Sequence, residues 1–315
     1  MKVYLSTFFL LIVLMLGSCK KNDNYNASQS KLYTPNSFTG VLVSSSVAKL
    51  TWGDSSSNET GFVIERKANN GTYTKLITLK ANINSYSDSS LLPYTTYKYR
   101  VYSYRDSTKS SYSNEVIVSN SYSPITSGST WTYLRNSSDS VYKDSVYKFT
   151  ATDSTLAIGD TSFSVINSTS GGNIYYATKD TGYFRRGSLL SSLGIDELST
   201  FSEFYLPKTL TINATWSNQL SVTYQSTPLP ITMKYTLKSV GDSLTVLGNK
   251  YTNVVHVGAT FTTVYFGFTL SLGGGDFYYA RGVGLISFNL STTDPTQPTK
   301  PAVTTTFNLK SYLIK

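Results

Sequence analysis

The stretch Leu91-Leu92-Pro93-Tyr94-Thr95-Thr96-Tyr97 decides the fold of the first part of the chain. It leads into a run in which Tyr97, Tyr99 and Val101 are spaced two residues apart, and this period predicts a β-strand with one buried face. The segment Val47–Trp52 alternates in the same way. Short alternating strands separated by turn residues are typical of an antiparallel sandwich, which we expect over residues 31–120.

Several segments of this region resemble a known family. Leu50-Thr51-Trp52, Phe62-Val63-Ile64-Glu65-Arg66, Leu91–Tyr97 and the closing Ser113-Asn114-Glu115-Val116 resemble the matching strands of a fibronectin type III domain. The resemblance implies an immunoglobulin-like sandwich in which Trp52 lies in the core. It also implies that Tyr97 is the corner tyrosine, whose hydroxyl bonds to upstream backbone. Such modules act as spacers or interaction platforms, and the fold alone does not choose between these roles.

The composition of the whole chain favours β-structure. The 315 residues, about two domains by length, are 14% charged and 14% aromatic, with 26 tyrosines and a net charge of +9. A charged fraction well below roughly 25% is unusual for a soluble domain. The chain has one Cys and one His, which excludes an internal disulfide and a Cys/His metal cluster, so we expect no metal and no cofactor.

The N-terminus carries an export signal. Lys2 precedes the apolar run Phe8–Leu16, which is too short to anchor the chain as a helix. The run ends in Leu16-Gly17-Ser18-Cys19, which resembles a bacterial lipobox. The resemblance implies a lipoprotein signal peptide over 1–18, a diacylglyceryl group and an N-acyl chain on Cys19, and a flexible tether over 19–30. Several acyl chains on one residue give stable membrane anchoring.

The tether also indicates the compartment. An Asp beside the lipidated Cys is the usual mark of inner-membrane retention, and Lys20 stands there instead. The resemblance therefore favours the outer membrane, either at the cell surface or on the periplasmic side. This address, together with scattered lysines that form no stripe, argues against a nucleic-acid partner.

Residues 121–315 are expected to form a second β-domain. Ser123–Tyr133, Leu247–Val257 and Phe277–Ile286 resemble the opening, central hairpin and late strand of a β-rich domain of unknown function in lipoproteins of Bacteroidota-type bacteria. Some of those domains are likened to half-open barrels that resemble periplasmic lipid carriers. The expected fold class is all-β: a fibronectin type III sandwich plus a C-terminal antiparallel sheet or half-barrel.

Four local expectations in this second domain can be compared with the structure. Leu189–Phe204 is the one candidate helix, because its apolar residues roughly follow a helical stripe. Thr260–Leu272 is expected to be one long aromatic strand. Gly273-Gly274-Gly275 is expected at a hairpin tip. Gly282 and Gly284 are expected to allow a bulge or a close backbone approach.

Candidate chemical groups are few. Asp196, Glu197 and Glu203 are close in sequence, as a glycosidase would need, but we expect them on a solvated face. His256 lies between Val255 and Val257 in an alternating strand, and we expect a surface or hydrogen-bonded histidine. The pair Arg185-Arg186 is the densest positive charge and would attract anionic polysaccharide, lipopolysaccharide or a lipid headgroup.

Exported proteins of Bacteroidota resemble one another in O-glycosylation at Asp-Ser or Asp-Thr motifs. That resemblance makes Ser140, Ser145, Ser154 and Ser243 candidate acceptors, each preceded by an Asp. Asp106-Ser107-Thr108 has the same form.

The function we expect is that of a lipid-anchored, non-enzymatic binding or interaction protein that recognises glycan or other envelope components. Three aromatic segments, Tyr175-Tyr176, Tyr265-Phe266 and Phe277-Tyr278-Tyr279, would stack on sugar rings or fill the core. Two alternatives stay open: a carrier of a lipid or hydrophobic ligand in a half-barrel, and an accessory protein of a polysaccharide hydrolase. The partners expected are thus the membrane, reached through the lipid, and a glycan, lipid or protein ligand.

Overall fold

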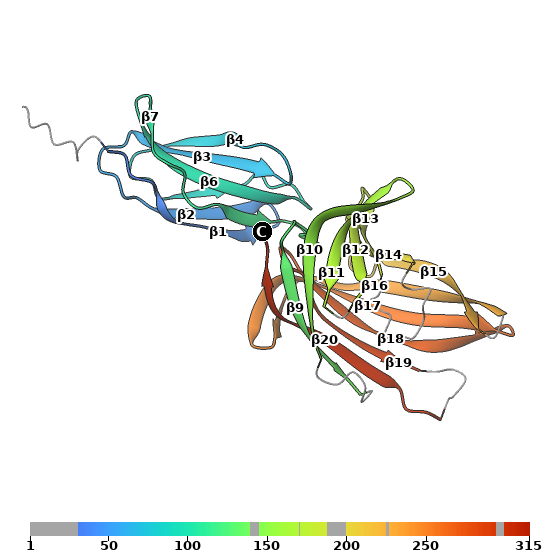
Figure 1. Cartoon of the computed structure of the whole chain (residues 1–315). Helices are drawn as coiled ribbons and strands as arrows, with labels where there is room; N and C mark the ends of the chain where they lie inside the picture. Colours follow the sequence, from blue (N-terminus) through green and yellow to red (C-terminus); the bar gives the residue numbers. More distant parts are fainter. Residues whose placement is uncertain (1–30, 139–144, 170, 188–199, 225–226, 294–298) are drawn as a thin grey trace, which may run out of the picture.

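The protein consists of two β-domains in series (Figure 1). The computed structural model describes residues 31–138, 145–169, 171–187, 200–224, 227–293 and 299–315. Within those ranges the regular structure is entirely β, and no helix is long and apolar enough to cross a membrane. The all-β class predicted from the sequence is confirmed.

The first domain is a sandwich of two antiparallel sheets. One sheet has the order β1-β2-β5, and the other has the order β4-β3-β6-β7 with β8 also paired to β6. The strands are β1 (Asn36–Ser44), β2 (Val47–Gly53), β3 (Gly61–Ala68), β4 (Thr74–Lys80), β5 (Ser85–Asp88), β6 (Thr96–Arg105), β7 (Thr108–Lys109) and β8 (Val116–Ser119). Between the sheets, Leu50 and Trp52 of β2 pack against Phe62 and Ile64 of β3.

The corner tyrosine expected from the sequence is present. Tyr97 is buried, and its hydroxyl accepts a hydrogen bond of 2.8 Å from the Leu92 backbone N–H. That bond fixes the loop that enters β6, because a backbone donor buried without a partner would cost free energy. The strand order and this corner together define a fibronectin type III-like sandwich.

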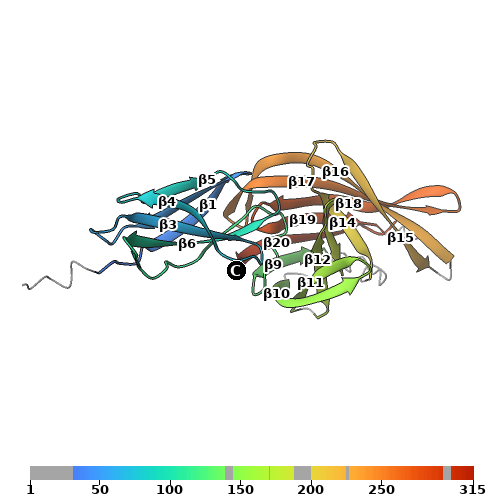
Figure 2. The same ribbon diagram turned by 90° about the horizontal axis from the view of Figure 1, so that it is seen from above.

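The second domain is one antiparallel sheet of twelve strands, in the order β14-β13-β12-β11-β10-β9-β20-β19-β18-β17-β16-β15. Its strands are β9 (Thr130–Ser137), β10 (Ser145–Ile158), β11 (Thr161–Ser168), β12 (Asn173–Thr178), β13 (Gly182–Arg186), β14 (Ser202–Pro207), β15 (Thr215–Tyr224), β16 (Thr227–Val246), β17 (Asn249–Tyr265), β18 (Phe268–Ala280), β19 (Gly284–Thr292) and β20 (Val303–Leu313). The sheet curls so that β9–β14 face the long strands β16–β20 across a shared core (Figure 2).

The curled sheet is nearly closed at the seam between its edge strands β14 and β15. The side-chain amide of Asn218 accepts a hydrogen bond from the Phe204 N–H and donates one to the Phe204 carbonyl, both at 2.9 Å. The Trp216 indole donates a third bond, of 3.1 Å, to the same carbonyl. Side chains thus satisfy edge groups that strand pairing would otherwise satisfy, which reduces the exposed edge. The half-barrel prediction is confirmed.

The structure differs from two local predictions. Residues 188–199 of the region around the predicted helix Leu189–Phe204 lie outside the described residues, and its described end, from Ser202 to Phe204, lies in strand β14. The predicted single strand Thr260–Leu272 is a hairpin, with β17 and β18 joined at Phe266-Gly267. The sequence did not indicate this turn, because its first residue is Phe266 rather than the Asn or Gly that such turns favour.

Gly273-Gly274-Gly275 is inside strand β18, so its prediction as a hairpin tip is also wrong. A Cβ on Gly273 or Gly275 would collide with the backbone carbonyls of Ser291 and Asn289 on β19. The glycines therefore allow β18 and β19 to approach closely, which is the role that the sequence predicts for Gly282 and Gly284.

The two domains are joined by a set of specific contacts around Arg281. Its guanidinium donates hydrogen bonds to Asn120 Oδ1 at 2.8 Å and to the Tyr122 hydroxyl at 3.1 Å. The neighbouring Gly282 N–H donates to the Ser121 carbonyl at 2.7 Å. Gly282 has a φ of 78°, and a Cβ there would lie 2.9 Å from the Ser119 carbonyl oxygen. The predicted close approach is confirmed, and it fixes the interdomain linker against the turn between β18 and β19.

Candidate functional site

The interior of the second domain holds a buried ion pair. Arg185 of β13 is 1% exposed, and its guanidinium donates to both carboxylate oxygens of Glu203 on β14, at 2.5 and 2.8 Å. The Tyr235 hydroxyl of β16 donates to the same carboxylate at 2.5 Å. This network connects β13 and β14 to the opposite wall of the curled sheet.

Burial and the Glu203 charge together shift the pKa values of Arg185 and Tyr235. Burial by itself lowers the pKa of Arg185, but the Glu203 carboxylate raises it well above its ordinary value. Burial and the same carboxylate raise the pKa of Tyr235 well above its ordinary value. The arginine therefore stays charged and the tyrosine stays protonated at neutral pH.

The network corrects two sequence interpretations. Glu203 was predicted on a solvated face, and it is buried instead. Arg185 was predicted to attract anionic ligands, but its charge is paired inside the domain, which leaves Arg186 alone of that pair at the surface side of β13. Asp196 and Glu197 lie outside the described residues.

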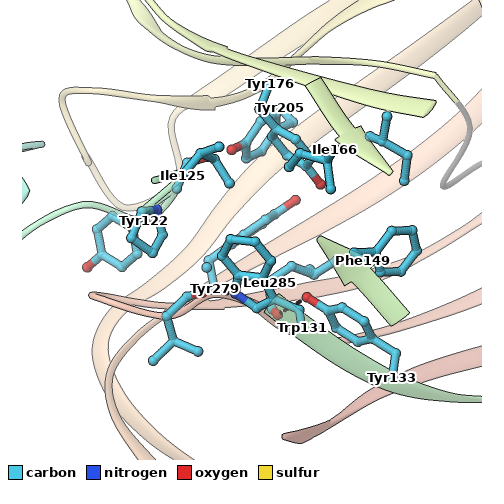
Figure 3. A pocket seen from close by; sticks show the side chains of 15 residues that line it. Tyr122, Ile125, Trp131, Tyr133, Phe149, Ile166, Tyr176, Tyr205, Tyr279 and Leu285 are labelled. Atoms are coloured by element: carbon cyan, nitrogen blue, oxygen red, sulfur yellow. Dashed lines mark hydrogen bonds between the residues drawn. The ribbon is translucent and has the colours of Figure 1, made fainter. Parts of the chain in front are cut away.

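A small cavity lies where the linker meets the curled sheet (Figure 3). On one side Tyr122 and Ile125 come from the linker, and on the other Trp131, Tyr133 and Tyr279 come from the interior. The Trp131 indole and the Tyr133 hydroxyl already donate to backbone carbonyls, both at 2.7 Å. The lining is thus mainly apolar, with polar atoms that have partners.

The cavity volume bears on the carrier alternative. About 40 Å³ is space for roughly one water molecule, whereas ligand pockets measure about 300–1,000 Å³. The linker residues Tyr122 to Ile125 form one side of this cavity. A cavity of this volume is too small for an acyl chain.

The outer face of strands β17 to β19 carries a different cluster, which we call the outer-face site: His256, Asp276, Tyr278 and Asn289. His256 Nε2 lies 2.6 Å from Asp276 Oδ1, and the two side chains are 26% and 37% exposed. The imidazole is stacked on the Tyr278 ring, with the ring centroids 4.5 Å apart. The backbone N–H of Asp276 donates to Asn289 Oδ1 at 3.1 Å.

Strand register explains why these residues meet. His256 of β17 is directly opposite Tyr278 of β18, and Asp276 is directly opposite Asn289 of β19. Directly opposed residues share a face of the sheet. Their neighbours Val255, Val257 and Phe277 point into the core, so the site faces outwards.

The surroundings of the outer-face site are polar. The residues paired with this site across the neighbouring strands are small or carry hydroxyl or amide groups: Thr236, Gly258, Ser287, Thr306 and Asn308. The stem of Lys238 lies over Gly258, where a Cβ would be only 2.8 Å from the lysine Cε. The site thus combines a cation, a carboxylate, an imidazole, amides and hydroxyls on one surface.

This arrangement can bind a ligand through hydrogen bonds. Burial and the Asp276 carboxylate raise the pKa of Tyr278, which keeps its hydroxyl protonated. Among the residues that the structure describes, no group of three His, Cys, Asp or Glu residues is placed to hold a metal ion. Hydroxyl-rich molecules match such a mixed set of donors and acceptors.

The other predicted sites have mixed outcomes. Cys19 and Ser140 lie outside the described residues. Ser145 begins β10 and is half-buried, while Ser154 and Ser243 are exposed. The exposed pair is therefore accessible, and glycosylation there stays a prediction. His256 is hydrogen-bonded at the sheet surface, as predicted.

The aromatic segments divide between core and surface. Phe277 and Tyr279 are buried and Tyr278 faces outwards, while Phe266 is highly exposed. Sequence reasoning missed Asp276 and Asn289. The signal available for Asp276 was its spacing of two residues from Tyr278, which puts both on one face of a strand.

No protein-family model matches this chain, and no curated protein matches it. Solved structures that are similar include an Fn3-like protein from Clostridium thermocellum, with 28% identity, covering 26% of this chain and 86% of that one, at a TM-score of 0.23. The hypothetical lipoprotein YmcC from Escherichia coli is 11% identical, covering 59% of this chain and 85% of that one, at a TM-score of 0.29. The FN1-FN3 domains of chicken CNTN1 are 8% identical, covering 80% and 100%, at a TM-score of 0.27.

Proposed function

We propose that this chain is a lipid-anchored, non-enzymatic binding protein of the outer membrane that recognises a glycan of the cell envelope through the outer-face site. The observation that supports it is the grouping of His256, Asp276, Tyr278 and Asn289 on one half-exposed surface. The fibronectin type III-like domain holds this surface away from the anchor. The alternatives of a lipid carrier and of a hydrolase accessory protein have no comparable observation in their favour.

The geometry defines the kind of glycan. Because one face of the Tyr278 ring is covered by His256, the ring offers its hydroxyl and edge more than an open stacking platform. Binding would therefore depend on hydrogen bonds from sugar hydroxyls to the carboxylate, amide and hydroxyl groups of β17 to β20. Hydrogen bonds to a charged group contribute about 1.5–3 kcal/mol each. A neutral, hydroxyl-rich polysaccharide suits this surface best.

Loss of the outer-face site should abolish glycan binding. The chain from Lys20 onwards, which contains every described residue, would be screened on bacterial polysaccharides and its affinity measured by calorimetry. Tyr278→Ala and His256→Ala should each weaken binding at least tenfold, which corresponds to about 1.4 kcal/mol. Tyr104→Ala is the matched control, because Tyr104 is a half-exposed tyrosine on β6 of the first domain, outside the site. Unchanged affinity in both site variants, or no glycan binding by the parent chain, would refute the proposal.

The lipid anchor is tested separately. Cys19→Ala should move the protein from the membrane fraction to the soluble fraction and remove labelling by a radioactive or clickable fatty acid, because the lipids would have no attachment point. Ser18→Ala is the matched control, since it changes the neighbouring residue to another small one and keeps the thiol. Membrane retention with lipid labelling in the Cys19 variant would contradict the lipoprotein assignment.

A further inference from the structure

The hairpin between β17 and β18 ends in exposed apolar side chains. Val264, Phe266 and Phe268 are 47%, 83% and 72% exposed. The Tyr265 ring lies beside them, with its centroid 4.3 Å from that of Phe266. We call Val264–Phe268 the hairpin tip. An exposed apolar cluster of this kind marks a contact with something other than water.

The backbone of the hairpin tip makes its aromatic residue unusual. Tyr265 and Phe268 are paired, so Phe266 and Gly267 form a two-residue turn, with φ values of 48° and 78°. Both positions of such a turn need positive φ, which favours Asn, Asp or Gly, and a bulky residue there is strained. Phe266 therefore costs the fold free energy, and its ring packs beside that of Tyr265 at the exposed end of the hairpin. This points to a role outside the folded domain.

The hairpin tip is also free of charge. No Asp, Glu, Lys or Arg occurs in residues 260–275, nor in residues 209–233, which include β15 and the start of β16. The two segments are adjacent, since Thr263 pairs with Ile231 and its hydroxyl donates to the Pro230 carbonyl at 2.9 Å. An edge of the domain that mixes hydroxyls and aromatics without charges resembles the composition of proteins at a membrane interface.

We propose that the hairpin tip inserts its aromatic side chains into the interfacial layer of a phospholipid bilayer. A protein partner fits less well because a stable interface buries about 800 Å² on each side. A buried aromatic side chain contributes roughly 150–250 Å², so two phenylalanines and a valine fall short of that area. A bilayer needs no such area, because it accepts individual aromatic and aliphatic side chains.

The location of the hairpin tip gives the insertion a structural consequence. In Figure 1 the described chain begins at one end of the molecule, and the β17–β18 hairpin extends at the other end. This step rests on the proposed function: with a lipid on Cys19, the protein would be held at both ends and would lie along the membrane. The outer-face site, between the two attachments, would then be presented to glycans close to that surface.

The test uses vesicles of phosphatidylethanolamine and phosphatidylglycerol with the chain from Lys20 onwards, which lacks the lipid. The parent chain should co-sediment with the vesicles. Phe266→Asn together with Phe268→Thr should reduce partitioning at least tenfold, because each phenylalanine buried in the interface contributes about that factor. Its thermal midpoint should not fall, since Asn suits the turn better than Phe.

The matched control is Val41→Thr with Val43→Thr, which replaces two exposed valines of β1 in the other domain and should leave partitioning unchanged. Absence of vesicle binding by the parent chain, or equal binding by the hairpin variant, overturns the proposal. So does a concentration-dependent dimer that only the hairpin variant loses, because the tip would then contact a second copy. Each result is independent of glycan affinity and of Cys19, so failure here leaves the proposed function standing.

Discussion

Glu203→Ala should lower the free energy of unfolding of the C-terminal domain by about 3–5 kcal/mol, because it leaves the Arg185 charge buried without a partner. The Tyr235 hydroxyl loses its acceptor as well. The Glu203 side chain links β13 and β14 to β16, so its loss should open the seam between β14 and β15.

The measurement is urea unfolding followed by tryptophan fluorescence. Trp216 reports directly on this region, because its ring is stacked on Tyr235 with the centroids 5.7 Å apart. The matched variant is Arg185→Met with Glu203→Leu, which removes both charges and replaces them with apolar side chains. It should lose far less stability than Glu203→Ala, since replacing a buried ion pair as a unit is often close to neutral. Equal losses in the two variants would show that charge burial is not the cause.

The local features of the first domain could be predicted because they depend on neighbours in sequence. The corner bond between Leu92 and Tyr97 spans a few residues, and alternation alone puts Tyr97 in the core. His256 follows the same logic, because the valines on both sides fix its outward direction. Period-two patterning is a reliable guide wherever one face of a sheet is buried.

The interior network could not be predicted for the opposite reason. Arg185 and Glu203 face each other across β13 and β14, and Tyr235 joins them from β16, with no motif that links the three. A charged residue normally indicates the solvent-exposed face of an element, so the charges of Arg185 and Glu203 wrongly predicted exposed side chains. The two buried charges and the Tyr235 hydroxyl come within hydrogen-bond distance only because the sheet curls and brings β16 close to β13 and β14.

The contacts of the interdomain linker also could not be predicted from the sequence. The resemblance of Phe277–Ile286 to a recurrent strand gave no role for Arg281, which proves to join the two domains through Asn120 and Tyr122. Tyr122 to Ile125 then line the cavity. One segment thus makes the interdomain contact and forms part of the cavity wall.

Trp52→Ala should lower the free energy of unfolding of the first domain by about 3–5 kcal/mol, the usual range for a large aromatic removed from a core. Trp52 is buried between the two sheets, with edge contacts to Phe38 and Phe62 at centroid distances of 6.2 and 5.6 Å. Thermal unfolding followed by circular dichroism measures the loss, and fluorescence from Trp131 and Trp216 follows the second domain separately.

Trp52→Phe separates packing from hydrogen bonding at this position. The Trp52 indole N–H is buried without a partner, so its removal relieves an unsatisfied donor while part of the ring volume is kept. We therefore expect Trp52→Phe to cost less than about 2 kcal/mol. A loss as large as that of Trp52→Ala would contradict this expectation. Unchanged unfolding of the second domain in both variants would show that the Arg281 contacts position the domains without making them one cooperative unit.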